Sequence, residues 1–405
     1  MGKILNIGYG CVFGTYWMIY AVVSSFSSIF LLAEGYTNSE IGATLAVANV
    51  LAVIIQPVIA DFADRSRRIG VIGLTEIITA MIMLFMVGMF TFSGGTPALC
   101  VIFVLVIAWH TVMQPLFNAM AFRLEETGYS INFGAARAVG SLAYAVLVAI
   151  LGTMVEKFGT GLLPVTGEIT CALLIVSLVF VGLNFHKTMK QKITDDRRFM
   201  PHRRGTGYSD EITLIQFVNR NKLFFLVNVG VVGLFFSNAV LNNYMAQIVD
   251  GVEGSTGDMG RILSLMAALE IPTMVFFNRI KERFSCRLLL KVAAVGFAVK
   301  ITICWLADSV LMLYIGQVFQ LVSFALWLPG IVHFTDEIMS KGEAVKGQAL
   351  FTTMVTVTTI FSSLLGGWIL DMAGPKMLTF IATLATAAGA MLIIAVIDKI
   401  EDKVE

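Results

Sequence analysis

The sequence predicts an all-α membrane protein of twelve transmembrane helices, arranged as two pseudo-symmetric six-helix bundles. Hydrophobic residues make up 57% of the chain and charged residues only 14%, whereas a soluble domain has about 25% charged residues. Twelve apolar runs reach the length of about 20 residues that a membrane-spanning helix needs. One long polar segment separates the sixth run from the seventh.

Six runs lie on each side of this polar segment. The predicted spans are residues 8–32, 40–62, 70–93, 97–122, 135–156, 162–185, 223–248, 259–279, 288–307, 310–335, 347–371 and 376–398. They predict an N-terminal bundle over residues 1–185 and a C-terminal bundle over residues 223–405. Residues 186–222 are predicted to form a cytoplasmic linker with a short amphipathic helix at 210–220.

Basic residues outside the spans are distributed unequally between the two sides of the membrane. Alternate loops carry nearly all of them, and the other side holds only Lys157, Arg261 and Lys376. Because cytoplasmic loops are enriched in Lys and Arg, both termini are predicted to lie in the cytoplasm. The expected location is the inner cell membrane, as a multi-pass protein.

Several classes of function are disfavoured. A net charge of +1 gives no indication of nucleic-acid binding. The five cysteines show no CxxC spacing, so neither a metal site nor a disulfide framework is expected. Without HExxH or GxSxG motifs, the chain is predicted not to be an enzyme and to need no cofactor. The expected partners are the lipid bilayer, a small solute and protons, with the monomer as the functional unit.

Three charged residues, Arg137, Glu270 and Lys300, lie within apolar runs. A charge at the centre of a bilayer costs about 2.5–3.5 kcal/mol on insertion scales. Such residues are kept where they line a water-filled path and pair with each other or with a substrate. They therefore indicate a transporter.

Polar residues recur three or four apart along several runs, and residues at these spacings share a helix face. Lipid cannot satisfy their hydrogen bonds, so these stripes are predicted to face the protein interior. Aromatic rings, amides and a guanidinium suit a polyhydroxylated solute, and hydrogen bonding between helices is the alternative. The stripes are Tyr16, Tyr20, Ser24 and Ser28; His110, Gln114 and Asn118; Arg137, Ser141 and Tyr144; Asn238 and Asn242; Tyr314, Gln317 and Gln320; and Thr352, Thr356, Thr359 and Ser363.

The chain resembles the major facilitator superfamily of transporters. Its halves echo each other weakly at corresponding positions, and parallel six-helix repeats around a binding site are a known transporter plan. The loop ADFADRSRR (60–68) resembles the signature of the superfamily between its second and third helices. The resemblance implies a gating loop in which Asp64 braces the cytoplasmic helix ends and Arg65 and Arg68 enforce orientation.

A closer resemblance is to lactose permease and the oligosaccharide:proton symporters. It is carried by PLFNAMAF, NFGAARAVGSLAYA and AALE. The resemblance implies that Arg137 binds the sugar and that Tyr144 stacks on its ring. It further implies that Glu270 is the essential glutamate of the eighth helix and that Lys300 belongs to the coupling network.

The chain departs from that group where the group has ionisable side chains. The replacing residues are Asn118, Asn238, Asn242, Gln317, Gln320 and Ser323. The last three stand where the tenth helix of the group has a lysine, a histidine and a proton-carrying glutamate. Proton coupling is therefore predicted to depend on Glu270 and Lys300.

These observations predict a secondary transporter that moves a sugar or oligosaccharide by alternating access with proton symport. An uncoupled facilitator, or an exporter of a nucleoside, aromatic acid or drug, is the alternative within transporters. A nontransporting membrane sensor is the alternative from another class. The predicted substrate ligands are Tyr20, Asn118, Arg137, Tyr144, Asn242, Glu270, Gln317 and Gln320.

Overall fold

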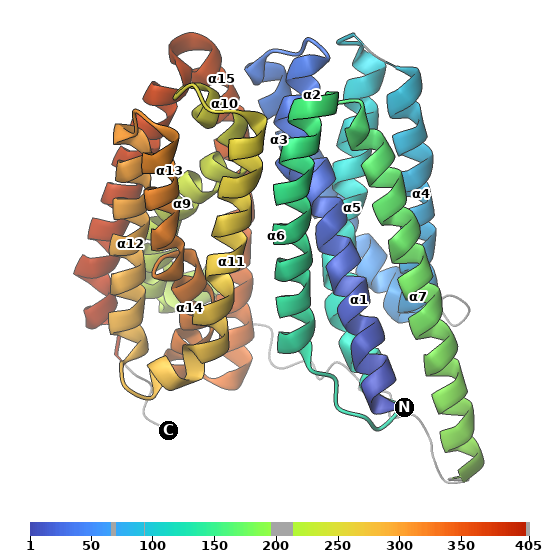
Figure 1. Cartoon of the computed structure of the whole chain (residues 1–405). Coiled ribbons are helices and arrows are strands. Elements are labelled where there is room, and N and C mark those ends of the chain that lie inside the picture. The colour runs from blue at the N-terminus through green and yellow to red at the C-terminus, as the bar shows by residue number, and fades with distance from the viewer. Residues whose placement is uncertain (66–69, 93, 196–213, 402–405) are drawn as a thin grey trace. The chain divides into compact units, whose positions relative to one another are not determined.

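The computed structural model describes residues 1–65, 70–92, 94–195 and 214–401, and the regular elements within these ranges are all helical. Eleven of the described helices are long and apolar enough to cross a membrane. The last, Glu343–Lys399, contains a non-helical residue, Gly374, whose φ of 75° favours glycine. Since Pro375 follows and the chain reverses there (Figure 1), this segment supplies two crossings. The predicted all-helical membrane fold with twelve spans is confirmed.

The chain divides into two compact units, Met1–Gly205 and Thr206–Glu405. The elements of the first unit are α1 (Gly2–Tyr20), the π-helical turn η1 (Ala21–Ser25), α2 (Ser27–Ala33), α3 (Asn38–Arg65), α4 (Val71–Thr91), α5 (Pro97–Glu125), α6 (Phe133–Phe158) and α7 (Leu162–Asp195). Within it, α1 packs against α6 and α7, and α5 packs against α3 and α4 (Figure 1). The first predicted span is formed by α1, η1 and α2 together.

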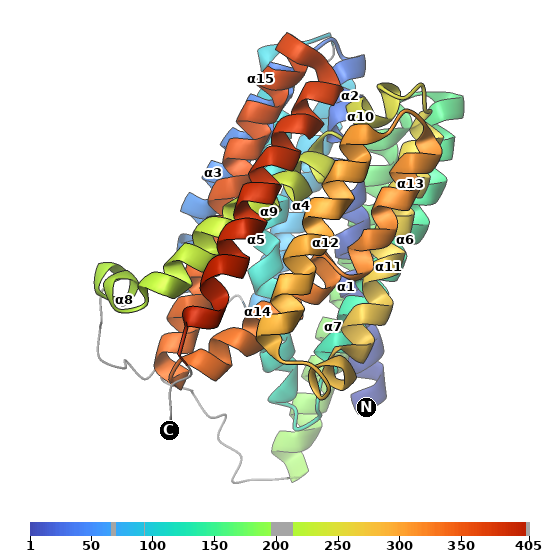
Figure 2. The ribbon, with the colours of Figure 1, turned by 90° about the vertical axis from the view of Figure 1, so that its left-hand side faces the viewer.

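The second unit has the same helical character. Its elements are α8 (Leu214–Arg220), α9 (Lys222–Asn243), α10 (Met245–Asp250), α11 (Thr256–Lys281), α12 (Cys286–Leu306), α13 (Val310–Val318), the 3₁₀ turn η2 (Phe319–Leu321), α14 (Phe324–Ile338), α15 (Lys341–Val396) and the 3₁₀ turn η3 (Ile397–Lys399). α15 packs against α9 and α12, with its second arm next to α12 in Figure 2, and α11 packs against α13 and α14.

The predicted linker differs from the structure at its start. α7 continues to Asp195, beyond the predicted end of the sixth span at residue 185. The sequence HKTMKQKITD (186–195) contains neither Gly nor Pro, so nothing in it ends the helix. In the second unit, α8 covers the described part of the amphipathic helix predicted over 210–220.

α9 and α15 approach each other closely because glycines line their contact. A Cβ atom on Gly233 would collide with the carbonyl of Ala385, and one on Gly389 would collide with the carbonyl of Gly230. Small residues let the backbones of membrane helices come together and gain van der Waals contact. This contact joins the first membrane-spanning helix of the unit to its last.

Three of the predicted spans are interrupted by backbone that is not α-helical within the described residues. η1 interrupts the first span at Ala21–Ser25, and η2 with the residues after it separates α13 from α14 in the tenth. Irregular backbone at membrane depth is tolerated only where protein encloses it or where it lines a water-filled cavity. The seventh predicted span is also interrupted, at Tyr244 between α9 and α10, so in the described residues the first unit has one interrupted span and the second unit has two.

Candidate functional site

In the second unit, three side chains form a hydrogen-bonded network that we call the amide bridge: Glu270 on α11, Gln320 in η2 and Lys300 on α12. Gln320 Nε2 donates to Glu270 Oε1 at 2.8 Å, and Lys300 Nζ donates to Gln320 Oε1 at 2.5 Å. Lys300 and Gln320 are both 1% exposed, and Glu270 is half-buried. A neutral amide thus lies between the carboxylate and the amine.

The break in the tenth span holds Gln320 in this position. Thr273 Oγ1 on α11 donates to the carbonyl oxygen of Leu321 at 2.9 Å, which satisfies an acceptor that the interrupted helix leaves unpaired. On the opposite side, a Cβ atom on Gly296 would lie 2.9 Å from the carbonyl oxygen of Val322. The glycine lets α12 come against the exposed backbone of the break.

Further buried polar side chains flank Gln320 in the tenth span. Gln317 Nε2 donates to Cys304 Sγ at 3.6 Å. Gln317 Oε1 and Ser323 Oγ are buried and have no hydrogen-bond partner among the described residues. A buried polar group without a partner costs about 1–3 kcal/mol, so their retention beside the bridge indicates a polar site rather than apolar packing.

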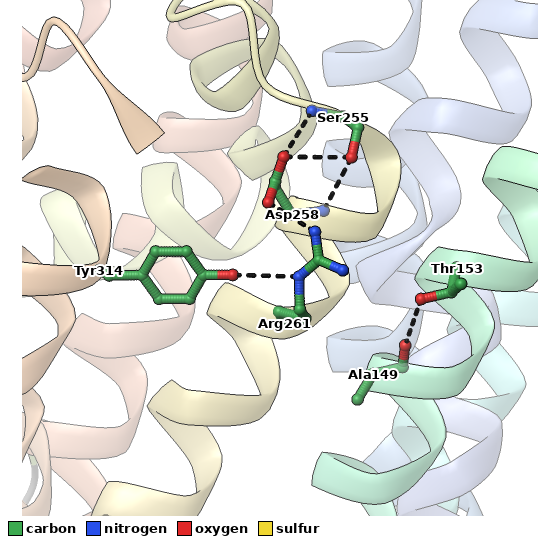
Figure 3. A network of polar contacts seen from close by, with 6 residues as sticks. All are labelled: Ala149, Thr153, Ser255, Asp258, Arg261 and Tyr314. Atoms are coloured by element: carbon green, nitrogen blue, oxygen red, sulfur yellow. Dashed lines mark hydrogen bonds and ion pairs between the residues drawn. The ribbon is translucent and has the colours of Figure 1, made fainter. Parts of the chain in front are cut away.

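A second network joins α11 to α13 near the start of both helices (Figure 3). Arg261 Nη2 donates to Asp258 Oδ1 at 2.7 Å, and Arg261 Nε donates to Tyr314 Oη at 3.4 Å. Asp258 is itself fixed by a capping box with Ser255. Together with the contacts at the break, these bonds hold the tenth span to α11 along its length.

In the first unit, an aromatic cluster surrounds the broken first span; its members are Tyr16, Trp17, Tyr20, His110 and Tyr144. The ring centroids of Trp17 and Tyr20 are 5.2 Å apart, and those of Tyr20 and Tyr144 are 6.0 Å apart. Tyr16 stacks on His110 at 4.4 Å. Trp17 and Tyr20 are half-buried and the other three are buried, so Trp17 and Tyr20 supply the accessible ring surface.

Tyr144 is only 6% exposed, and its hydroxyl hydrogen-bonds to that of Ser25 at 2.8 Å. Ser25 ends η1, so the π-helical turn connects the first span to this ring. Gly140, about one turn earlier on α6, leaves room for the indole of Trp17: a Cβ atom there would lie 2.5 Å from Trp17 Cδ1. The structure therefore places Tyr144 behind the two accessible rings.

The remaining predicted ligands are more dispersed. Arg137 is half-buried, its charge acts on Tyr16, and it makes no hydrogen bond or ion pair with another described residue. Asn118 is exposed. Asn242 Nδ2 donates to the carbonyl of Asn238 at 2.8 Å, a bond within its own helix.

The predicted gating loop lies largely outside the described residues, which exclude Arg68 and the side chain of Asp64. Arg65 is described: its Nε lies 2.7 Å from Asp61 Oδ1, and both side chains are exposed. This ion pair spans one turn at the end of α3.

Two features were not foreseen from the sequence. The stripe on the first span omitted Trp17, although Gly140 in the facing GSLAY segment is the small residue that accommodates it. The sequence also left Glu270 as the direct partner of Lys300, whereas the structure inserts Gln320 between them. Lys300 and Gln320 lie on different elements, so the spacing of residues along one helix could not predict their contact.

Comparisons with known proteins identify the family of the chain. The sequence profile of the MFS_1 like family matches residues 11–382. The solved structure of the nucleoside transporter NupG matches with a TM-score of 0.71 at 14% identity, over 98% of this chain and 100% of that chain. A mutant form of NupG gives 0.76 at 12% identity, over 97% and 99%.

A bacterial homolog of the human lysosomal transporter Spinster, in an inward-facing and unoccupied conformation, matches with a TM-score of 0.67 at 12% identity. The match covers 98% of this chain and 97% of that chain. At these identities the likeness is one of fold. The comparison with curated proteins gave no match.

Proposed function

We propose a function from the premise that the chain belongs to the MFS_1 like family of the major facilitator superfamily, and is thus a multi-pass transporter of a small solute and not an enzyme. The proposed substrate is a sugar or oligosaccharide, moved with protons by alternating access of the two units. The resemblance of NFGAARAVGSLAYA and AALE to the oligosaccharide:proton symporters supports this choice.

The observation that carries the proposal is the chemistry of the aromatic cluster in the first unit and of the polar groups around the amide bridge in the second. The accessible rings of Trp17 and Tyr20 offer a flat surface to the C–H face of a sugar ring. Amides and carboxylates together supply the donors and acceptors that hydroxyl groups require. We assign hydroxyl binding to Asn118 and Arg137 in the first unit. In the second unit we assign it to Glu270, Asn242, Gln317 and Gln320.

Proton coupling is assigned to Glu270 and Lys300. Glu270 is half-buried and is the one of the two that we assign to contact with the solute, whereas Lys300 is buried. The Gln320 amide connects them, so a change of charge or hydrogen bonding at one is felt by the other.

A nucleoside is the second candidate substrate. The fold resembles that of NupG, whose solved structures are described as those of a nucleoside transporter. The ring surface of Trp17 and Tyr20 would stack a nucleobase as readily as a sugar, and side-chain amides pair with base edges. This candidate keeps the same site and changes only the solute.

The test begins with thermal-shift measurements on the purified protein with lactose, raffinose and uridine. A ligand at 100 times its Kd stabilises a protein by about 2.7 kcal/mol, which is readily detected. We expect one of the sugars to raise the melting temperature. A shift with uridine alone would select the nucleoside.

Radiolabelled uptake into proteoliposomes then tests coupling. Accumulation above equilibrium under an imposed pH gradient is expected, and equilibration without accumulation would indicate an uncoupled facilitator. Arg137→Ala should abolish binding. Arg123→Ala, which removes an exposed ion pair to Glu126 at 2.7 Å, is the control. Unchanged affinity in Arg137→Ala would contradict the site assignment.

A further inference from the structure

Lys300 has an uncommon set of contacts for a buried lysine. Its Nζ donates to Gln320 Oε1 at 2.5 Å and to Met266 Sδ at 3.6 Å, and it makes no ion pair within the described part of the chain. The residue is 1% exposed. Buried charges in proteins are otherwise paired with an opposite charge.

The surroundings of Lys300 contain few other titratable groups. Glu270 on α11 and Cys304 on its own helix are the groups whose charges act on it, and Glu270 is connected to it through Gln320. From α13 and η2 the facing groups are the neutral amides of Gln317 and Gln320. In the described residues no charged group of α9, α14 or α15, which also pack near α12, acts on Lys300.

The two contacts of Nζ are fewer than an ammonium ion can make. A charged lysine has three N–H donors, whereas the neutral amine has two and a lone pair. One N–H donates to an oxygen and a second donates to a sulfur. A third N–H has no acceptor among the described residues. Burial without an ion pair also favours the uncharged form over the ammonium.

We propose that Lys300 Nζ is the atom that takes up and releases the transported proton, and that Gln320 is the residue that positions it. This inference rests on the proposed function and deepens it by identifying the proton carrier. On uptake, the amine lone pair forms an N–H bond to a proton from hydronium, leaving water. On release, water accepts that proton and becomes hydronium. Both steps occur when Lys300 is open to one side of the membrane, and the conformation described here encloses it.

The amide bridge couples this proton to the solute. Ionised Glu270 accepts from Gln320 Nε2 and polarises the amide, which makes Gln320 Oε1 a stronger acceptor for the ammonium. Solute hydroxyls that donate to Glu270 keep its carboxylate ionised. Solute on Glu270 and proton on Lys300 therefore favour each other, and this coupling is reciprocal, as symport requires.

The first experiment needs no solute. Potentiometric titration of the purified protein between pH 6 and pH 9 counts the protons released per chain. Lys300→Arg keeps a guanidinium that does not release its proton in this range, so it should release one proton fewer than the wild type. Lys291→Arg, on the same helix and paired with Asp398 at 2.6 Å, should match the wild type. An equal count in Lys300→Arg and the wild type would overturn the proposal.

Should Lys300→Arg not yield monodisperse protein, Lys300→Met serves as the second variant. It removes the amine and adds no titratable group, so the same loss of one released proton is expected. An undiminished count in this variant would likewise overturn the proposal.

The second experiment uses proteoliposomes with radiolabelled lactose and uridine in parallel. Exchange of labelled for unlabelled solute needs no net proton movement, whereas accumulation under a pH gradient does. Lys300→Arg should retain exchange and lose accumulation by at least tenfold, and normal accumulation would contradict Lys300 as the carrier. If the wild type moves neither probe, the proposed solute class fails, and the titration still decides the role of Lys300.

Discussion

At the scale of single residues, Gln320 carries two hydrogen bonds that no other described side chain can replace. In Gln320→Leu, Glu270 loses its amide donor and Lys300 loses its oxygen acceptor. We expect a loss of stability of about 1–3 kcal/mol, the usual cost of leaving buried polar groups unpaired, measured as a lower melting temperature in detergent. Gln317→Leu is the matched control, because Gln317 donates only to a sulfur and its Oε1 is already unpartnered within the described residues. Equal melting temperatures for the two variants would contradict the importance of the bridge.

Gly140 determines where the indole of Trp17 can lie. Gly140→Ala would place a Cβ atom 2.5 Å from Trp17 Cδ1 and 3.1 Å from Trp17 Nε1, so the ring must move. If Trp17 forms the ring surface of the binding site, solute affinity should fall about tenfold, or about 1.4 kcal/mol, in an equilibrium binding assay. Gly134→Ala on the same helix, whose Cβ would meet only Asn132 Oδ1 at 3.7 Å, should bind normally. Unchanged affinity in Gly140→Ala would exclude Trp17 from the site.

At the scale of helices, the spans could be predicted from the sequence and their breaks could not. Hydropathy and length are properties of each run alone, so the twelve spans followed from composition. The segment QVFQLVSFALW (317–327) contains neither glycine nor proline, so no helix-breaking residue marks the break. The break is stabilised by contacts from other helices, namely the Thr273 bond to Leu321 and the close approach at Gly296. For the same reason, the costly charge of Lys300 could be read from the sequence, but its bridging amide could not.

At the contact of α9 with α15, the direction of the change in melting temperature on replacing glycine by alanine distinguishes close packing from helix propensity. Replacing glycine by alanine within a helix favours the helix by up to about 1 kcal/mol. Gly182→Ala, whose Cβ would lie 3.6 Å from Ile72 Cγ2, should therefore leave the melting temperature unchanged or raise it. Gly233→Ala would collide with the backbone of Ala385 and should lower it, by the equivalent of about 1–3 kcal/mol for an overpacked contact. A rise in both variants would show that the two helices can separate without cost.

At the scale of the whole molecule, each unit has a broken span next to its polar groups. η1 leads through Ser25 to Tyr144 in the first unit, and η2 carries Gln320 in the second. Many secondary transporters have their substrate sites at interrupted helices, where backbone N–H and C=O groups lack their regular intrahelical hydrogen bonds. The sequence indicated the doubled architecture through its weak repeats. The breaks in the described residues differ in type, being a π-helical turn in the first unit and, in the second, a 3₁₀ turn and the non-helical Tyr244, so no shared motif marked them.

The membrane orientation is a property of the whole chain and gives the last prediction. If both termini are cytoplasmic, the loop between α3 and α4 faces the cytoplasm and the loop between α6 and α7 faces the outside. Gly70 and Gly161 lie in these loops, and a side chain on either would meet nothing within 4 Å, so a cysteine at each is sterically matched. In a background with Cys11, the one exposed native cysteine in the described residues, replaced by serine, a membrane-impermeant maleimide should label intact cells carrying Gly161→Cys. Cells carrying Gly70→Cys should be labelled only after permeabilisation. The reverse pattern would invert the proposed topology, and with it the side from which Glu270 and Lys300 receive their proton.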